Sequence, residues 1–251
     1  MAVLSVGGWG AQKRTMPALL RRTLTLVIAG LPGVLSLLAV LPELPGVPRV
    51  ALLANPVILL ILAALVGSWA APRCGFLLVS PTIRKRQRLG QALIGLALGM
   101  FIAAFDHWGR SLWQSASGIP ASVVEAWAPA SLLVGLLYGG VVEEVIMRWG
   151  LMSVLAAGML GVSGKSERSS GFVIAVAVVL AALVFAASHL PMLLASGHGL
   201  TTNVVARTLL LNTLVGVAYG AIFARRDLVS AVTVHGATHV GFAATAILAR
   251  A

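Results

Sequence analysis

Seven long apolar runs follow one another along this sequence of 251 residues, and they leave it few ways to fold. Each run is close to the roughly 20 residues that a helix needs to cross a bilayer core about 30 Å thick. Charged residues make up only 10% of the chain, against about 25% in an average soluble domain. We therefore predict an all-α, polytopic membrane helical bundle with seven transmembrane helices, near residues 23–42, 50–71, 89–105, 130–160, 171–195, 203–224 and 228–249.

The basic residues predict the orientation of this bundle. Short cytoplasmic loops carry an excess of Lys and Arg, and a cytoplasmic N-terminus leaves only Arg49, Arg110 and Arg250 outside. The cytoplasmic residues are then Lys13, Arg14, Arg21, Arg22, Arg73, Arg84, Lys85, Arg86, Arg88, Lys165, Arg168, Arg225 and Arg226. This pattern assigns the net charge of +11 to topology and to contact with the lipid bilayer. We expect no nucleic-acid partner.

The same reading divides the chain into three parts. Residues 1–22 form a basic cytoplasmic tail, residues 23–128 form N-terminal transmembrane helices without diagnostic motifs, and residues 129–251 form a helical core. The stretch from Ser111 to Trp127 is an alternative eighth, interfacial helix. The predominance of Arg over Lys is typical of GC-rich bacterial genomes, so the expected location is a bacterial plasma membrane.

Two further features concern packing within the spans. Gly-x-x-x-Gly pairs leave flat strips on which helices approach closely in lipid, and we expect them to serve packing inside the bundle. They are Gly95 with Gly99, Gly135 with Gly139, and Gly216 with Gly220. Arg207 lies one turn into the sixth span, where a snorkelling side chain is expected to reach the outer surface.

Ionisable side chains inside a bilayer cost several kcal/mol unless they are paired or hydrated, so they are candidates for function. The fourth span holds Glu143, Glu144 and Arg148 in VVEEVIMRWG. Glu144 and Arg148 stand four residues apart on one helical face and are expected to pair, which leaves Glu143 free. The seventh span holds His235 and His239, also four residues apart and expected to project into the same space.

At these positions the chain resembles the CPBP family of intramembrane proteases, also called the CAAX protease or Abi family. The strings EEVIMR, FAASH and HGATH match the family patterns EExxxR, FxxxH and HxxxN, with His239 where the family usually has Asn. The string FAASH runs from Phe185 to His189. The likeness covers residues 130 to 245, so it implies a CPBP-like catalytic core within residues 129–251.

The resemblance implies an intramembrane endopeptidase of the glutamate type, without a cofactor. Glu143 with His189 would activate a water for attack on a peptide carbonyl, while His235 and His239 would donate to the oxyanion. Glu144, Arg148 and Phe185 would support this site. The implied partner is a peptide or membrane-protein substrate, cut near the cytoplasmic half of the bilayer; the oligomeric state is not predicted.

Three alternatives remain at this point. Glu143, His189, His235 and His239 are residue types that bind zinc, although the HExxH pattern of many zinc proteases is absent, so metal-free hydrolysis ranks first. A second alternative is a non-catalytic binding or bacteriocin-immunity protein that keeps the polar pocket. A third is a transporter that uses the same residues as a proton relay.

Depth along the helices tests whether these residues can meet. At about 1.5 Å per residue, Glu143 lies about 21 Å from Pro129, level with His235 on the seventh span. His189 lies about 27 Å from Gly171, which is too far toward the outer surface. The prediction of one shared site therefore depends on tilt or on a helix that begins before the membrane.

Overall fold

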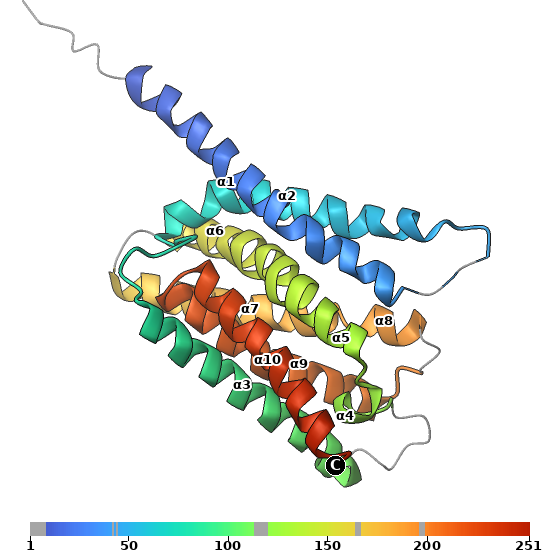
Figure 1. The fold of residues 1–251 in the computed structure, drawn as a ribbon. Helices are drawn as coiled ribbons and strands as arrows, with labels where there is room; N and C mark the ends of the chain where they lie inside the picture. The colour runs from blue at the N-terminus through green and yellow to red at the C-terminus, as the bar shows by residue number, and fades with distance from the viewer. Residues whose placement is uncertain (1–8, 42, 44, 113–119, 164–166, 196–198) are drawn as a thin grey trace, which may run out of the picture.

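A computed structural model describes residues 9–41, 43, 45–112, 120–163, 167–195 and 199–251 (Figure 1). These residues form a bundle of helices that run roughly along one common direction. In chain order the elements are α1 (Trp9–Ser36), η1 (Leu37–Ala39), η2 (Arg49–Leu53), α2 (Ala54–Ala70), η3 (Ala71–Cys74), α3 (Lys85–Trp108), η4 (Gly109–Leu112), α4 (Val123–Ala126), α5 (Pro129–Val134), η5 (Gly135–Glu143), η6 (Val145–Met152), α6 (Ser153–Ser163), α7 (Glu167–Ala187), α8 (Leu190–Ala195), α9 (Thr202–Arg225) and α10 (Leu228–Leu248).

The prediction of seven membrane-spanning helices is confirmed. In the part of the chain that the structure describes, seven helices are long and apolar enough to cross a membrane. They cover Ala18–Ala39, Arg49–Cys74, Lys85–Leu112, Pro129–Val162, Gly171–Leu194, Thr202–Arg225 and Leu228–Leu248. The third span extends furthest beyond its prediction, because its helix continues through polar residues at both ends.

The fourth span departs from the α-helix that its sequence predicts. Between α5 and α6 the chain forms two π-helices, η5 and η6, joined at Glu144. A π-helix bonds residue i to residue i+5 and is rare, and it occurs often at functional sites. Its wider turn still brings Arg148 Nη1 within 3.1 Å of Glu144 Oε1, so the predicted pairing of these side chains is confirmed.

The glycine pairs pack helices of this chain against one another. A Cβ atom at Gly95 or Gly99 would overlap the backbone of α10 at Val234 and Thr238, so α3 and α10 can approach closely only because both residues are glycine. In the same way Gly216 of α9 faces Ala182 of α7. The expectation of internal packing is therefore confirmed for these two pairs.

A buried carboxylate holds one end of the bundle together. This end, which we call the basic end, contains residues 73–88 and 225–228. Asp227 accepts hydrogen bonds from Arg88 Nη2 at 2.6 Å, from the Ser80 backbone N–H at 2.6 Å and from Ser230 Oγ at 2.6 Å. Burial raises the pKa of Asp227, but these hydrogen bonds outweigh it and hold the pKa below its ordinary value.

A second buried ion pair fixes the opposite end. Arg207 donates to both carboxylate oxygens of Asp106, at 2.6 and 2.7 Å, and the Val123 backbone N–H donates to the same carboxylate at 2.8 Å. Arg207 is only 9% exposed, so the expectation that it snorkels to the surface is wrong. The buried partner Asp106, on another helix, is the reason.

The predicted interfacial helix over Ser111 to Trp127 is confirmed only in part. Residues 113–119 lie outside the described residues, and the described remainder contains the short helix α4. Ser122 and Glu125 cap α4 reciprocally, each side chain accepting a hydrogen bond from the other's backbone N–H. The structure thus places one helical turn where the sequence suggested a longer helix.

Replacing Asp227 with Asn should destabilise the bundle at its basic end. The change leaves Arg88, whose side chain is 22% exposed, without its anionic partner, and breaking such a pair costs about 3 kcal/mol. We expect a lower melting temperature in detergent. Because the pKa of Asp227 is lowered from 3.8, its stabilising contribution is complete above pH about 4 and is lost as the pH falls through the lowered value.

The matched control is Arg226→Gln, because Arg226 is the exposed neighbour of Asp227. Its melting temperature should equal that of the unchanged protein. Equal melting of D227N and R226Q would contradict the role assigned to the carboxylate.

Candidate active site

A cavity of about 500 Å³ lies inside the bundle, and the predicted site residues line it. Glu143, His189, His235 and His239 all contribute to its wall. They come from three spans: η5 carries Glu143, the turn after α7 carries His189, and α10 carries both other histidines. The rest of the wall consists of Val40, Val123, Ala126, Trp127, Ser131, Leu132, Val134, Gly135, Tyr138, Gly139, Phe185, Asn212, Val215, Tyr219 and Phe242.

His189 lines the same cavity as Glu143 and His235, although the count along its span placed it too far toward the outer surface. Helix α7 begins at Glu167, before the membrane-spanning part that starts at Gly171, and ends at Ala187. His189 therefore lies beyond the helix, in a turn that precedes α8. Its ring is anchored there by a hydrogen bond between Nδ1 and the Phe185 carbonyl oxygen at 2.8 Å.

Glu143 is the accessible carboxylate of the cavity. Its side chain is 23% exposed, whereas that of Glu144 is 0% exposed. No Lys or Arg is among the residues that line the cavity. The imidazole of His235 is near Glu143, and its Nε2 atom lies 3.9 Å from Glu143 Oε2. Glu143 is thus available to a ligand in the cavity.

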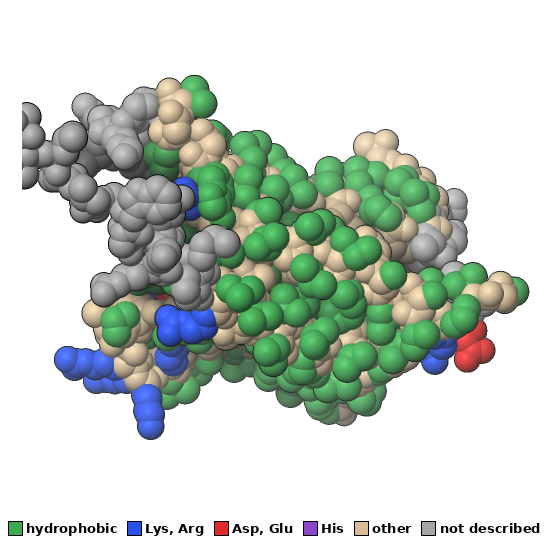
Figure 2. All heavy atoms as spheres, turned by 90° about the horizontal axis from the view of Figure 1, so that it is seen from above, with side chains coloured by type: hydrophobic (Ala, Val, Ile, Leu, Met, Phe, Trp, Pro, Cys, Tyr) green, Lys and Arg blue, Asp and Glu red, His purple; other side chains and the backbone are tan. Residues whose placement is uncertain are grey.

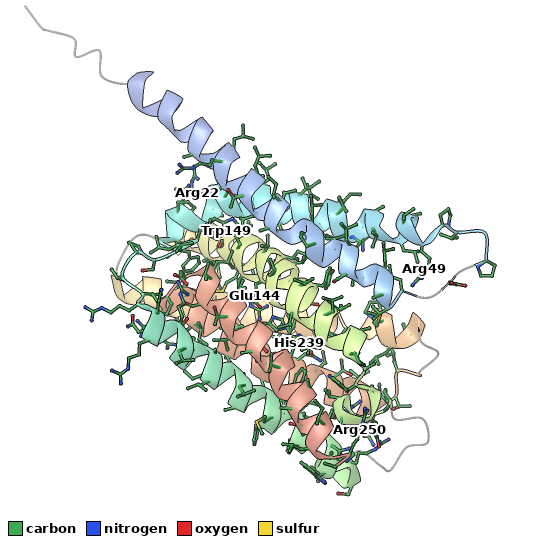
Figure 3. The ribbon with its side chains drawn as sticks, in the orientation of Figure 1. Arg22, Arg49, Glu144, Trp149, His239 and Arg250 are labelled. Carbon is green, nitrogen blue, oxygen red and sulfur yellow. The ribbon has the colours of Figure 1, made fainter. Side chains whose placement is uncertain are left out.

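Glu144 lies behind the cavity wall and binds two partners. Its Oε1 accepts a hydrogen bond from His235 Nδ1 at 2.8 Å and lies 3.1 Å from Arg148 Nη1. Arg148 also donates to the Gly216 carbonyl oxygen at 3.1 Å. In Figure 3 Glu144 lies deep in the bundle, between Trp149 and His239. One buried carboxylate therefore connects the fourth, sixth and seventh spans.

This arrangement decides which atoms of His235 carry protons. A carboxylate oxygen only accepts, so the proton of neutral His235 lies on Nδ1, toward Glu144. Nε2 of His235 is then an acceptor on the cavity side. His239 Nε2 lies 3.3 Å from it and is placed to donate. The N–H of His239 is consequently the donor that a ligand in the cavity can recruit.

Aromatic rings hold the two histidines in place. Tyr219 stacks on the His235 ring with centroids 4.3 Å apart, and His235 stacks on His239 at 5.1 Å. Phe185 meets the His189 ring edge to face at 4.9 Å and lies under the Arg148 guanidinium at 4.9 Å. Phe185 thus lies between the ion pair and the cavity, in the supporting position that the resemblance implied.

Sequence analysis missed several residues of the cavity wall, and those with a polar side chain include Ser131, Tyr138, Asn212 and Tyr219. A polar side chain in an apolar span was the available signal. Tyr219 lies in the string YGAIFARRDLVSAVTVH that approaches the third motif. Its ring stacking was not predictable, because it depends on the rotation of α9 against α10.

Two glycines of the fourth span make room for His239. A Cβ atom at Gly139 would lie 2.6 Å from His239 Nε2, and one at Gly135 would overlap the same ring. The pair Gly135 and Gly139, expected to pack helix against helix, therefore seats an imidazole against the backbone of η5. This explains why a ring larger than the usual Asn fits at position 239.

The described residues do not provide a group of side chains arranged to bind zinc. Among residues 9–41, 43, 45–112, 120–163, 167–195 and 199–251, no three His, Cys, Asp or Glu side chains are arranged to hold a metal ion. The Nδ1 atoms of His189 and His235 are hydrogen-bonded to a carbonyl oxygen and a carboxylate. Metal dependence is therefore a matter for experiment.

Gly139→Ala should disturb the site and destabilise the protein. The added methyl group presses on the His239 ring, and such overpacking costs about 1–3 kcal/mol. We expect a lower melting temperature. Gly158→Ala is the matched control, since a Cβ atom at Gly158 meets nothing within 4 Å. A melting temperature of G139A as high as that of G158A would contradict the seat described above.

Comparison with known proteins bears on the same segment. Residues 125–241 match a family model described as type II CAAX prenyl endopeptidase Rce1-like. No curated protein and no solved structure matches the chain. The matched segment includes all three motifs and all four candidate catalytic residues, Glu143, His189, His235 and His239. The resemblance to the CAAX proteases is thereby confirmed, and residues 125–241 are similar to the Rce1-like family.

Proposed function

We propose that this multi-pass membrane protein is an intramembrane endopeptidase that cleaves a peptide or membrane-protein substrate without a metal cofactor. The observation that carries the proposal is the meeting of an accessible carboxylate and three imidazoles, from three spans in all, on one cavity. The match of residues 125–241 to a family model of CAAX endopeptidases supports hydrolysis of a peptide bond. The plasma membrane of a bacterium is the proposed location.

In the proposed reaction Glu143 and His189 bind and activate a water molecule. Glu143 takes a proton from the water as its oxygen attacks the peptide carbonyl carbon, so a C–O bond forms and the carbonyl becomes an oxyanion. Collapse of this intermediate breaks the C–N bond. The proton held by Glu143 passes to the leaving nitrogen, which departs as the amine, and the carboxyl product remains.

The oxyanion is proposed to be stabilised by the histidines of α10. His239 donates from Nε2 by turning its N–H from His235 to the oxyanion. His235 donates from Nε2 only when it carries a second proton, and Glu144 would stabilise that cation through Nδ1. Hydrogen bonds to the oxyanion stabilise the transition state strongly in a site with little water.

Glu143→Gln should abolish cleavage and leave the fold intact. Gln has the same shape but cannot accept the proton of water, and loss of a general base lowers rates by about 10²–10⁴-fold. The measurement compares peptides released from membranes of cells that express the protein or the variant, by mass spectrometry. Glu43→Gln, an exposed carboxylate outside the cavity, is the control and should leave the peptide pattern unchanged.

A peptide pattern that stays the same in E143Q would sink the hydrolase proposal. It would favour the non-catalytic binding or bacteriocin-immunity protein, in which the cavity recognises a peptide and leaves it uncut. The melting temperature of E143Q is measured in parallel, so that loss of the folded protein is not mistaken for loss of chemistry.

Two replacements of His239 test whether its imidazole acts as a hydrogen-bond donor or as a zinc ligand. His239→Asn restores the family's usual residue, whose amide also donates, so cleavage should persist. His239→Leu removes the donor and should lower the rate by about 10²–10³-fold. Loss of cleavage in H239N, together with inhibition of the unchanged protein by a strong chelator, would favour the zinc-dependent alternative instead.

A further inference from the structure

The cavity reaches the surface at one end of the bundle. Its wall runs from Glu143 and Tyr219, inside the spans, outward through Ser131 to Ala126 and Trp127, and Ala126 is exposed. Val40, which follows η1, also lines it. All of the outward residues lie at the end opposite the basic end. We call residues 121–127 the lip of the cavity.

The path from the site to the basic end is closed. Trp149 and Phe223 are each 1% exposed and lie edge to face with centroids 6.4 Å apart. Phe76 packs on Phe223 at 4.8 Å. Beyond these rings the Leu228 and Val229 backbone N–H groups donate to the carbonyl oxygens of residues 77 and 78, next to the Asp227 cluster. A smaller cavity at this end includes Trp149 in its wall but none of the catalytic candidates.

Charged side chains fix the position of the lip through hydrogen bonds to its backbone. Asp106 and Arg207 bind it through the Val123 N–H and the Ala121 carbonyl oxygen. Arg250 donates to the carbonyl oxygens of Val124 and Trp127, both at 3.1 Å. In Figure 3 Arg250 and Arg49 lie at this end, beyond His239 and away from Arg22. The arginines here therefore bind protein oxygens.

The free positive charge lies at the other end. Arg84, Lys85, Arg86, Arg225 and Arg226 are all exposed there. Figure 2 shows Lys and Arg side chains gathered at this end and hydrophobic side chains over the middle of the bundle. The excess of Lys and Arg marks the cytoplasmic side of short loops. The closed end therefore faces the cytoplasm, and the lip faces away from it.

We infer that the substrate peptide reaches the site from the non-cytoplasmic side, over the lip formed by residues 121–127. This inference rests on the proposed function, which supplies the substrate. It concerns the side of entry, and the cut near the cytoplasmic half of the bilayer stays a prediction. Among the described residues that line the cavity, Glu143 is the one Asp, Glu, Lys or Arg, and Val134, Leu132 and Phe242 are apolar. The segment that enters is accordingly apolar and uncharged.

One feature of the lip fits an extended peptide. Trp127 Nε1 is buried and has no hydrogen-bond acceptor in the described part of the chain. A peptide has a carbonyl oxygen at every residue, so a chain that enters beside Trp127 provides the missing acceptor. The indole thus marks the side of the cavity along which the backbone runs.

Thiol labelling tests the direction of access without an activity assay. Cys74, the only cysteine, is first replaced by Ser. Ser131→Cys then places a thiol in the cavity, and Leu133→Cys on the same helix places one on the surface that faces lipid, where Leu133 is 49% exposed. Lys85→Cys marks the basic end. The probe is a membrane-impermeant, positively charged methanethiosulfonate, applied to spheroplasts and to inverted membrane vesicles.

The expected result is labelling of S131C in spheroplasts but not in inverted vesicles, the reverse for K85C, and none for L133C on either side. Ala126→Cys, at the lip, should behave like S131C and serves if S131C does not fold. Labelling of both cavity thiols only in inverted vesicles, or on neither side, would overturn the inference. So would labelling of K85C in spheroplasts. Because no cleavage is measured, failure of E143Q to alter peptides would leave this result intact.

Discussion

The site depends on one buried carboxylate. Glu144 has no exposure to solvent, so its charge is tolerable only because Arg148 and His235 both bind it. Each of these partners belongs to a second contact as well: Arg148 reaches the backbone of α9 at Gly216, and His235 stands against His239 on α10. Removing the carboxylate would leave a buried guanidinium unpaired and would free the His235 ring to turn. Glu144 therefore fixes three helices relative to one another and fixes the face that His235 presents to the cavity, while Glu143, one residue earlier, stays accessible.

Adjacent identical residues thus receive different environments from geometry alone. Glu143 lies on the cavity wall and Glu144 behind it, as the helical rotation between neighbours requires. Glu143 is open to a ligand in the cavity, whereas Glu144 is shared through Oε1 by a guanidinium and an imidazole N–H. The two glutamates of the motif therefore differ in role: Glu143 can react with a ligand, and Glu144 orients His235 and Arg148. The π-helical turns around both residues set the angle between them.

The sequence was sufficient to predict the seven spans, the Glu144–Arg148 pair and the convergence of Glu143, His189, His235 and His239 on one cavity. Span length and the cost of charge in lipid act on each helix separately, so a single sequence carries that information. The π-helices, the Asp106–Arg207 pair and the stacking of Tyr219 on His235 depend on contacts between distant segments. No local pattern encodes them. Arg207 shows the difference well, because its snorkelling was a sound expectation for an isolated helix and failed once Asp106 of α3 lay opposite.

The two ends of the bundle also differ in what their basic side chains bind. At the closed end a single buried carboxylate, Asp227, collects donors from three segments, while the surrounding arginines and lysines remain exposed. At the opposite end Arg49, Arg207 and Arg250 donate to carbonyl and carboxylate oxygens of the protein. Exposed cations favour the side with anionic headgroups, whereas cations satisfied by the protein contribute little to that preference. The distribution of bound and unbound arginine therefore explains how a chain can carry arginine at both ends and still define one orientation, and that orientation sets the side from which the cavity is entered.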